Sequence, residues 1–233
     1  MWSAERKPAG FWLRYAAWSL DAACLLPLLL LLGKPIIDAA LEQAKASMQV
    51  LQLAMAQQLD NATAEQSPLT MTLSLLSDPR THAGVERLST ALTHLVLLPP
   101  LLYAGLACLW SVGFECSGWQ ATPGKRVFGL IVTDRNGQGL QPLQALVRFV
   151  AAGLSWVTLN LGHALVLFAP HLALHDRLSQ TRVLVESGNG ALPSWGRAWL
   201  LVQELAALAG TAWLFIAMRD WMQGLLAQTL SGV

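Results

Sequence analysis

Charged side chains are scarce in this sequence. Only 12% of its 233 residues are Asp, Glu, Lys or Arg, about half of the roughly 25% that is typical of soluble domains. So few charges cannot coat a water-soluble globule, and a hydrophobic content of 54% excludes a disordered chain. The 15 basic and 14 acidic residues give a net charge of +1, so no basic field marks a nucleic-acid partner. The composition predicts an integral membrane protein whose first partner is the lipid bilayer.

The sequence also lacks the signatures of metal sites and of common enzymes. Its three cysteines form no Cys-x-x-Cys pair, and its five histidines show no metal-ligand spacing. Gly124 and Lys125 suggest a phosphate loop, but the glycine spacing is wrong and Arg126 stands where Ser or Thr is needed. No Ser, His and Asp occur in a recognisable nucleophile context. We therefore expect no enzymatic activity, no metal and no cofactor.

Apolar stretches locate the membrane segments. Four are long enough as helices to cross a hydrocarbon core of about 30 Å: Tyr15–Gly33, Leu88–Phe114, Phe149–His175 and Ala198–Met218. The third is ambiguous, because a straight crossing places Asp176 outside, whereas a break returns it to the cytoplasmic side. We expect a break near Asn160–His163, since non-helical backbone is tolerated at that depth when protein or water covers it.

The flanking basic residues predict the orientation. Basic residues cluster before the first span and after the second, at Arg6, Lys7, Arg14, Lys125, Arg126, Arg135 and Arg148. The loop 34–87 instead carries four basic and six acidic residues. The positive-inside rule therefore predicts a cytoplasmic N-terminus and an outward-facing loop. Apolar residues in this loop recur every three or four positions and predict a helical hairpin continuous with the first two spans: Leu41, Ala44, Met48, Leu51 and Met55.

Two short strands are candidates for a cytoplasmic element. Val127–Thr133 is rich in β-branched residues and is followed by the turn signal Asn136-Gly137, and Pro142 suits the start of the next helix. Thr181–Val185 is the second candidate. Tryptophans near the ends of the apolar runs are interpreted as anchors at the lipid headgroups: Trp12, Trp18, Trp110, Trp119, Trp199 and Trp221.

Three motifs occur together along the chain. They are GFWLRYAAWSLD at 10–21, TPGKRVFGLIVTD at 122–134 with ALVR at 145–148, and LHDRLSQTRV at 174–183. Their order and content resemble the RDD family of bacterial membrane proteins, named for one arginine and two aspartates, which match Arg14, Asp21 and Asp176 here. The resemblance covers the first span and most of residues 90–186. It implies a membrane fold and a role in transport, and sodium/proton antiport has been proposed for some family members.

The candidate functional site is a polar network of Arg14, Asp21 and Asp176. Arg14 and Asp21 are seven residues apart, so a helix places them on one face, about 10 Å apart along its axis. Asp21 is interpreted as a proton or cation site, or as a polar clamp between helices. Asp176 is interpreted as part of that network, or as a helix cap or local ion pair beside Arg177. Supporting motif residues are Glu115, Thr122, Gly124, Lys125, Arg148 and Thr181.

Together these patterns predict an all-α membrane protein with three to four membrane-inserted helical segments and a helical outer loop. A small cytoplasmic β element is compatible with this class. Residues 1–186 are expected to form the RDD-like membrane domain, and 187–233 a linker and an additional membrane helix. We expect a multi-pass protein of the bacterial inner (plasma) membrane. We expect its function to be transport of a cation or small solute, proton-coupled at Asp21; the alternative is a non-transporting scaffold or accessory subunit of a larger complex. A small bundle has little interior for a pathway, so a homo-oligomer or a membrane partner protein is expected in either case.

Overall fold

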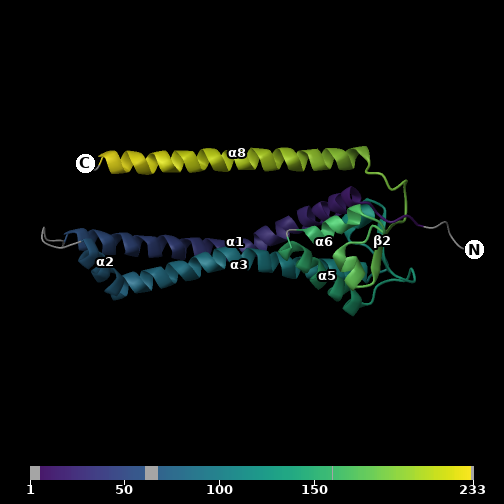
Figure 1. Ribbon diagram of the computed structural model, residues 1–233, viewed down its shortest axis with the longest axis horizontal. Helices are drawn as coiled ribbons and strands as arrows, with labels where there is room; N and C mark the ends of the chain where they lie inside the picture. The colour runs from purple at the N-terminus through teal and green to yellow at the C-terminus, as the bar shows by residue number, and fades with distance from the viewer. Residues whose placement is uncertain (1–5, 61–67, 159, 232–233) are drawn as a thin grey trace, which may run out of the picture. The chain divides into compact units, whose positions relative to one another are not determined.

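The computed structural model describes residues 6–60, 68–158 and 160–231 (Figure 1). In chain order, the elements are α1 (Phe11–Asp60), α2 (Pro68–Ser77), α3 (Pro79–Glu115), α4 (Pro123–Val127), β1 (Leu130–Asp134), α5 (Pro142–Val157), α6 (Leu161–Ala164), the 3-10 turn η1 (Leu165–Leu167), α7 (Leu174–Leu178), β2 (Thr181–Val185) and α8 (Ser194–Ser231). The chain forms two compact units, one of residues 21–113 and one of residues 1–20 with 114–233. Helices dominate both units, which confirms the predicted all-α class.

Three helices are long and apolar enough to cross a membrane: residues 11–58 of α1, all of α3 and residues 194–224 of α8. Their large apolar side chains point outward, as at Leu31, Leu109 and Phe215. An exposed apolar surface of this kind marks contact with lipid. The chain is therefore a membrane protein, and the three long apolar helices of its described residues fall within the predicted range of three to four inserted segments.

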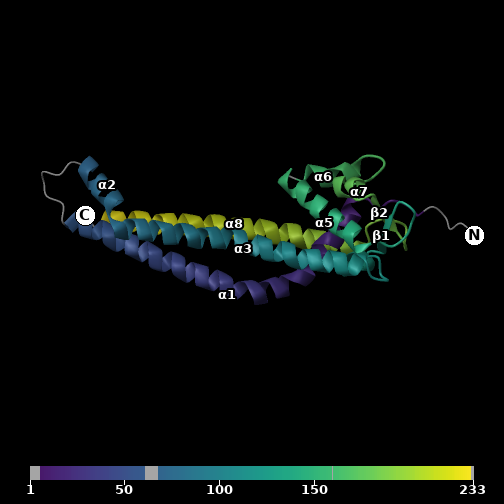
Figure 2. The same cartoon turned by 90° about the horizontal axis from the view of Figure 1, so that it is seen from below.

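The predicted helical hairpin between the first two spans is confirmed. Figures 1 and 2 show α1 and α3 side by side within the unit 21–113. In the part of α1 beyond the first span, small residues seven positions apart are buried: Ala40, Ser47 and Ala54. A Cβ atom added to Gly84 of α3 would lie 2.9 Å from the Leu51 side chain, so this leucine packs directly on the glycine. Small residues allow this close approach between membrane helices.

Most of the large apolar residues that predicted this hairpin lie outside its contact face, with Leu51, which faces Gly84, as the exception. Leu41, Met48 and Met55 are exposed. In water, a stripe of such residues turns inward, but lipid tails are as apolar as leucine and exert no such force. The spacing therefore predicted the helix correctly, whereas the buried face belongs to the smaller residues beside the stripe.

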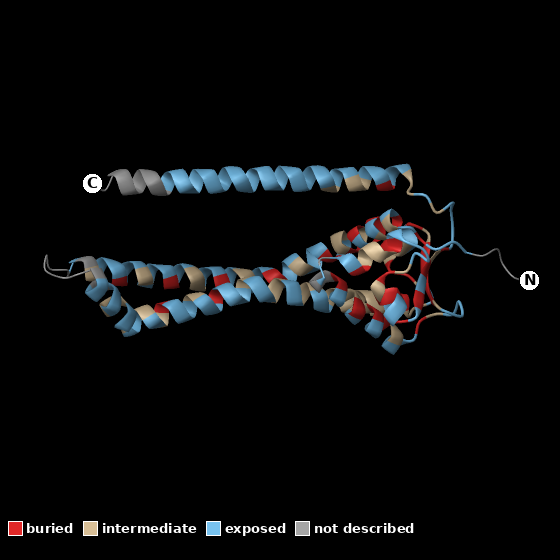
Figure 3. Ribbon diagram, in the orientation of Figure 1, coloured by how far each residue is buried: buried red, intermediate tan, exposed pale blue. Residues whose placement is uncertain are grey.

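The small β element is an antiparallel pair of β1 and β2. Leu130 pairs with Val185, and Asp134 pairs with Thr181. The chain before α1 lies along the other edge of β2, where the Ala9 N–H donates to the Val183 carbonyl at 3.0 Å. β2 has the predicted bounds, and the buried apolar residues of β1 make this sheet a small core (Figure 3).

The first strand begins later than predicted. Val127 belongs to α4, and β1 starts at Leu130. Pro123 occupies the first turn of α4, where its missing N–H costs nothing. Gly129 then has a φ of +67°, a conformation that favours glycine, and it separates the helix from the strand.

The third apolar run is broken, as predicted. α5 ends at Val157, and Asn160 has a left-handed φ of 65° before the short α6 begins. The chain then returns through η1 to α7, which packs against α5. The return places Asp176 of α7 beside Arg148 of α5.

The first turns of α8 are fixed by aromatic side chains. Trp195 stacks on Phe128, with ring centroids 4.5 Å apart. The Trp199 indole N–H donates to Ser19 Oγ at 3.0 Å, and the Gln203 amide donates to the same oxygen. Trp199 therefore holds the start of α8 to α1.

Candidate functional site

A buried set of charged side chains lies where the start of α1, the end of α3, α5 and α7 meet. Its first contact joins elements far apart in sequence: Arg14 Nη1 donates to Asp176 Oδ2 at 2.5 Å. Arg14 also donates through Nε to the Ala9 carbonyl and through Nη2 to the His171 carbonyl. This one guanidinium therefore ties α1 both to the preceding segment and to the returning chain.

Asp176 is both a helix cap and an ion-pair partner. The Ala173 N–H donates to Asp176 Oδ2 at 3.1 Å, which caps the start of α7. The other carboxylate oxygen, Oδ1, accepts from Arg148 Nη1. The prediction of a cap is therefore confirmed, but the ion pairs are made with Arg14 and Arg148 rather than with the neighbouring Arg177.

Arg148 continues the set toward α3 and β2. Its Nη1 also donates to Thr181 Oγ1 at 2.7 Å, and its Nε lies 3.3 Å from Glu115 Oε2. Glu115 Oε1 in turn accepts from Lys125 Nζ at 2.5 Å. Positive and negative groups thus alternate through five residues, which we call the ion-pair chain: Arg14, Asp176, Arg148, Glu115 and Lys125.

Local structure explains how these groups meet. Pro142 starts α5 so that Arg148 and Ala145 face the unit's interior, and both are buried. Thr122 precedes α4 and Gly124 lies buried inside it, which brings Lys125 back over the end of α3. The supporting motif residues predicted from sequence therefore lie in or beside the ion-pair chain.

Burial and charge act in opposite directions on Asp176. Burial alone would raise the pKa of this carboxyl, but Arg148 and Arg14 outweigh it and hold the pKa well below its usual value. Burial alone would likewise lower the pKa of Arg148, but Asp176 and Glu115 raise it. These groups therefore stay charged at neutral pH, and the ion-pair chain carries three cations and two anions.

Two histidines, His163 and His175, lie beside the ion-pair chain. No sequence pattern indicated that His175 belongs there. The rings of His163 and His175 are 5.2 Å apart, and His175 is buried. Burial lowers the pKa of His175 well below its usual value, and the nearby Arg148 adds to this effect. The His175 imidazole is thus neutral near pH 7.

Acidification is expected to destabilise the protein through His175. An unfolded imidazole has a pKa of about 6.5, and the folded pKa is lower, so below about pH 6.5 the unfolded state binds more protons and stability falls. Asp176 acts at lower pH. Its folded pKa lies below the ordinary 3.8, so the stability that its charged form contributes is lost as the pH falls below 3.8 toward the folded pKa. Denaturant unfolding in detergent micelles between pH 7 and 5 measures the first effect.

The variant that tests this pH dependence removes the histidine itself. His175→Gln is expected to flatten the slope of unfolding free energy against pH. Equal slopes in the wild type and His175→Gln would contradict the role of His175.

Asp21 accepts a hydrogen bond from a tryptophan of α3. Its carboxylate is buried and accepts from the Trp110 indole N–H at 3.0 Å. Arg14 makes its ion pair with Asp176. Of the predicted network, the structure therefore joins Arg14 and Asp176 in an ion pair, and it gives Asp21 the Trp110 indole as a hydrogen-bond donor.

A metal centre finds no support in the part of the chain that the structure describes. Within it, no group of three or more His, Cys, Asp or Glu side chains is arranged to hold a metal ion. The free cysteines Cys24, Cys108 and Cys116 form no disulfide there. The chemistry available at the site is that of carboxylates, guanidinium groups, an ammonium group and imidazoles.

Comparisons with known proteins agree with the motifs. The uncharacterized protein YxaI of Bacillus subtilis (strain 168) is 27% identical over 179 residues, which cover 76% of this chain and 97% of YxaI. No solved structure matches the chain. The RDD family matches residues 8–180, which include Arg14, Asp21, Asp176 and the other members of the ion-pair chain. Because this match spans well over half of the sequence, the chain belongs to the RDD family.

Proposed function

We propose that this protein transports a cation or a small solute across the bacterial inner (plasma) membrane, with proton coupling at Asp21. The observation that carries the proposal is the buried Asp21 carboxylate in an apolar helix long enough to cross a membrane. An ionisable group in such a helix is costly and commonly marks an ion or proton pathway. Its carboxylate can bind a cation or a proton, and Trp110 fixes one of its oxygens.

The ion-pair chain has a supporting role in this proposal. Each of its carboxylates contacts two cationic side chains. Such a set holds helices in place and offers no unpaired carboxylate to a transported cation. We therefore assign substrate binding to Asp21, and the positioning of α1 to Arg14 and its partners.

A non-transporting scaffold or accessory subunit is the second candidate. The ion-pair chain favours it, because charge-compensated contacts between α1, α5 and α7 suit a rigid structural part. The exposed apolar surface of α8 is large enough to serve a second copy or a membrane partner protein. In this role, Asp21 and Trp110 act as a polar clamp between α1 and α3.

Transport is tested by reconstituting the full chain in liposomes that contain a pH-sensitive dye. Asp21→Asn is expected to reduce ion-driven proton flux at least tenfold at normal protein abundance, because the amide cannot exchange a proton or hold a cation. Asp21→Glu keeps the charge and is expected to change the flux without abolishing it. Glu42→Gln, on an exposed part of α1, is the matched control and should behave as the wild type.

The liposome assay also separates the two candidates. Wild-type protein that conducts no more than empty liposomes, across a series of monovalent cations, would overturn transport and leave the scaffold. Flux that is unchanged in Asp21→Asn would instead overturn the assignment of Asp21.

We also propose that the N-terminus faces the cytoplasm. The support is the basic residues before α1 and after α3, compared with the acidic excess in residues 34–87. In a cysteine-free background, Lys45→Cys is expected to react with an impermeant maleimide from outside spheroplasts. Asn136→Cys, in the exposed turn after β1, is expected to react only after permeabilisation. The reverse pattern would overturn the orientation.

A further inference from the structure

Helix α5 has its polar and apolar sides reversed relative to a helix in water. Its inward stripe contains Gln144, Arg148, Ala151 and Ser155, spaced by four, three and four residues, which is one face of a helix. Arg148 and Ser155 are buried there. The Gln144 side-chain amide donates to the Ser179 carbonyl at 3.0 Å. The polar side chains of α5 therefore point into the protein.

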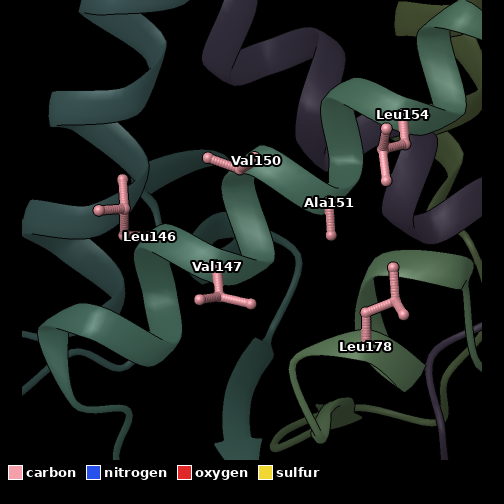
Figure 4. Close-up of a pocket in the computed structure, with 6 residues that line it drawn as sticks. All are labelled: Leu146, Val147, Val150, Ala151, Leu154 and Leu178. Atoms are coloured by element: carbon pink, nitrogen blue, oxygen red, sulfur yellow. The ribbon is translucent and has the colours of Figure 1, made fainter.

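The outward side of α5 is apolar. Leu143, Val150 and Leu154 are 72%, 62% and 52% exposed. Figure 4 shows this side of the helix together with Leu178 of α7. A shallow groove of about 450 Å³ runs between them, lined by Leu146, Val147, Val150, Ala151, Leu154 and Leu178.

The apolar surface continues past the end of α5. Leu161, Leu167 and Phe168, which lie in or beside α6 and η1, are 69%, 56% and 67% exposed. In water, a helix turns its apolar stripe inward and its polar face outward. An outward apolar side that extends over the following turn, opposite a buried arginine, indicates that the surroundings of this segment are apolar. Because the same chain carries three long apolar helices, lipid acyl chains are the occupant that fits.

The segment is too short to cross the bilayer, and it returns to its starting level. α5 has 16 residues, which span about 24 Å, less than a hydrocarbon core of about 30 Å. From Arg148 to Val157 the helix rises only about 14 Å. The chain then turns and brings Asp176 back to Arg148. The segment therefore reaches about half of the core thickness and comes back.

Backbone hydrogen bonds at the turn fit this location. The Asn160 N–H donates to the Ser155 carbonyl at 2.6 Å, and the Leu161 N–H donates to the Thr158 carbonyl at 3.1 Å. The Thr158 hydroxyl donates to the Leu154 carbonyl near the end of α5. Non-helical backbone at membrane depth requires such internal partners.

We infer that α5, α6 and η1 form a re-entrant element. It enters the bilayer from the side that holds the ion-pair chain, dips to about mid-depth and returns, with lipid acyl chains filling the groove along α5. The ion-pair chain then lies at the entrance of this element and fixes both of its arms, through Arg148 on α5 and Asp176 on α7. The inference does not depend on transport and holds equally for a scaffold.

Spin labels on the full chain test this inference. Single cysteines in a cysteine-free background, at Val147, Val150 and Leu154, would carry a nitroxide in vesicles of phosphatidylcholine and phosphatidylglycerol. These positions are exposed, so the labels should not disturb packing. We expect collisions with oxygen to exceed those with a water-soluble nickel chelate, and the depth to increase from 147 to 154. A label at Asn136, in the exposed turn after β1, is the control and should favour the nickel chelate.

Each alternative has its own result. Labels at Val150 and Leu154 that favour the nickel chelate would place α5 in water. Labels that neither reagent reaches would show a protein partner or a second copy in the groove. A label at Phe168 that lies at the far surface of the bilayer would show a complete crossing. Any of these results overturns the re-entrant, lipid-facing element.

A second measurement uses the wild-type chain and needs no substitution. Phosphatidylcholine with a photoreactive diazirine in the middle of its acyl chain should modify peptides covering residues 146–154, and not the β1–β2 turn. Failure to modify those peptides, in vesicles where α8 is modified, would overturn acyl-chain contact.

Discussion

Asp176→Asn is expected to lower the free energy of unfolding by about 3–5 kcal/mol, the range found when one partner of a buried ion pair is removed. The asparagine leaves the partly buried Arg14 and the buried Arg148 facing a neutral group, and both guanidinium groups lose the charge that compensates their desolvation. Unfolding by denaturant in detergent micelles, together with the yield of folded protein in membranes, measures the loss.

The double variant shows whether the pair acts as one unit. Arg14→Gln in the Asp176→Asn background removes one stranded cation, so part of the lost stability should return, and the two changes should not be additive. Glu186→Gln is the matched control, because its pair with Arg126 is exposed and is worth less than about 1 kcal/mol. Additive losses in the double variant would contradict a direct Arg14–Asp176 coupling.

Arg148→Lys is expected to cost about 2–3 kcal/mol, although it preserves the charge. The guanidinium group reaches Asp176, Thr181 and Glu115 at once. The single ammonium group of lysine is compact and cannot contact all three residues at once. Thr181 and Glu115 would therefore each lose their hydrogen-bond or ion-pair contact with residue 148. The same denaturant experiment measures the effect.

An exposed arginine provides the comparison for this substitution. Arg126→Lys changes the same groups where the side chain contacts Glu186 at the surface, and it is expected to change stability by less than about 0.5 kcal/mol. Equal effects at positions 148 and 126 would show that only the charge of Arg148 matters, not its geometry.

The long helices and the break in the third apolar run were predictable because local composition reports on them. Hydrophobic length and the scarcity of charge report directly on contact with lipid, and α1, α3 and α8 follow them. Asn160 and Gly162 interrupt the third run with residues that tolerate a turn, and the helix ends at Val157. Thr181–Val185 was likewise visible as a β-branched segment.

Contacts between distant residues were not visible in the same way. Trp110 lies 89 residues from Asp21, and its position near the end of an apolar run is equally typical of a headgroup anchor. Glu115 and Arg148 were recognised as motif residues, but no spacing rule indicates that they share one chain of ion pairs with Lys125. The buried face of α1 was missed because size rather than hydrophobicity selects it in a membrane.

The separation of Arg14 and Asp176 along the chain has a consequence for biosynthesis. The two residues are 162 positions apart, which the ribosome covers in about 8–30 s at roughly 5–20 residues per second. During that time, α1 has its arginine but not the carboxylate that neutralises it. The segment before α1 also waits for β2, since Ala9 bonds to Val183. The start of the first membrane helix therefore reaches its final contacts only when the last quarter of the chain is being made, and a nascent chain that stops before residue 176 cannot secure it.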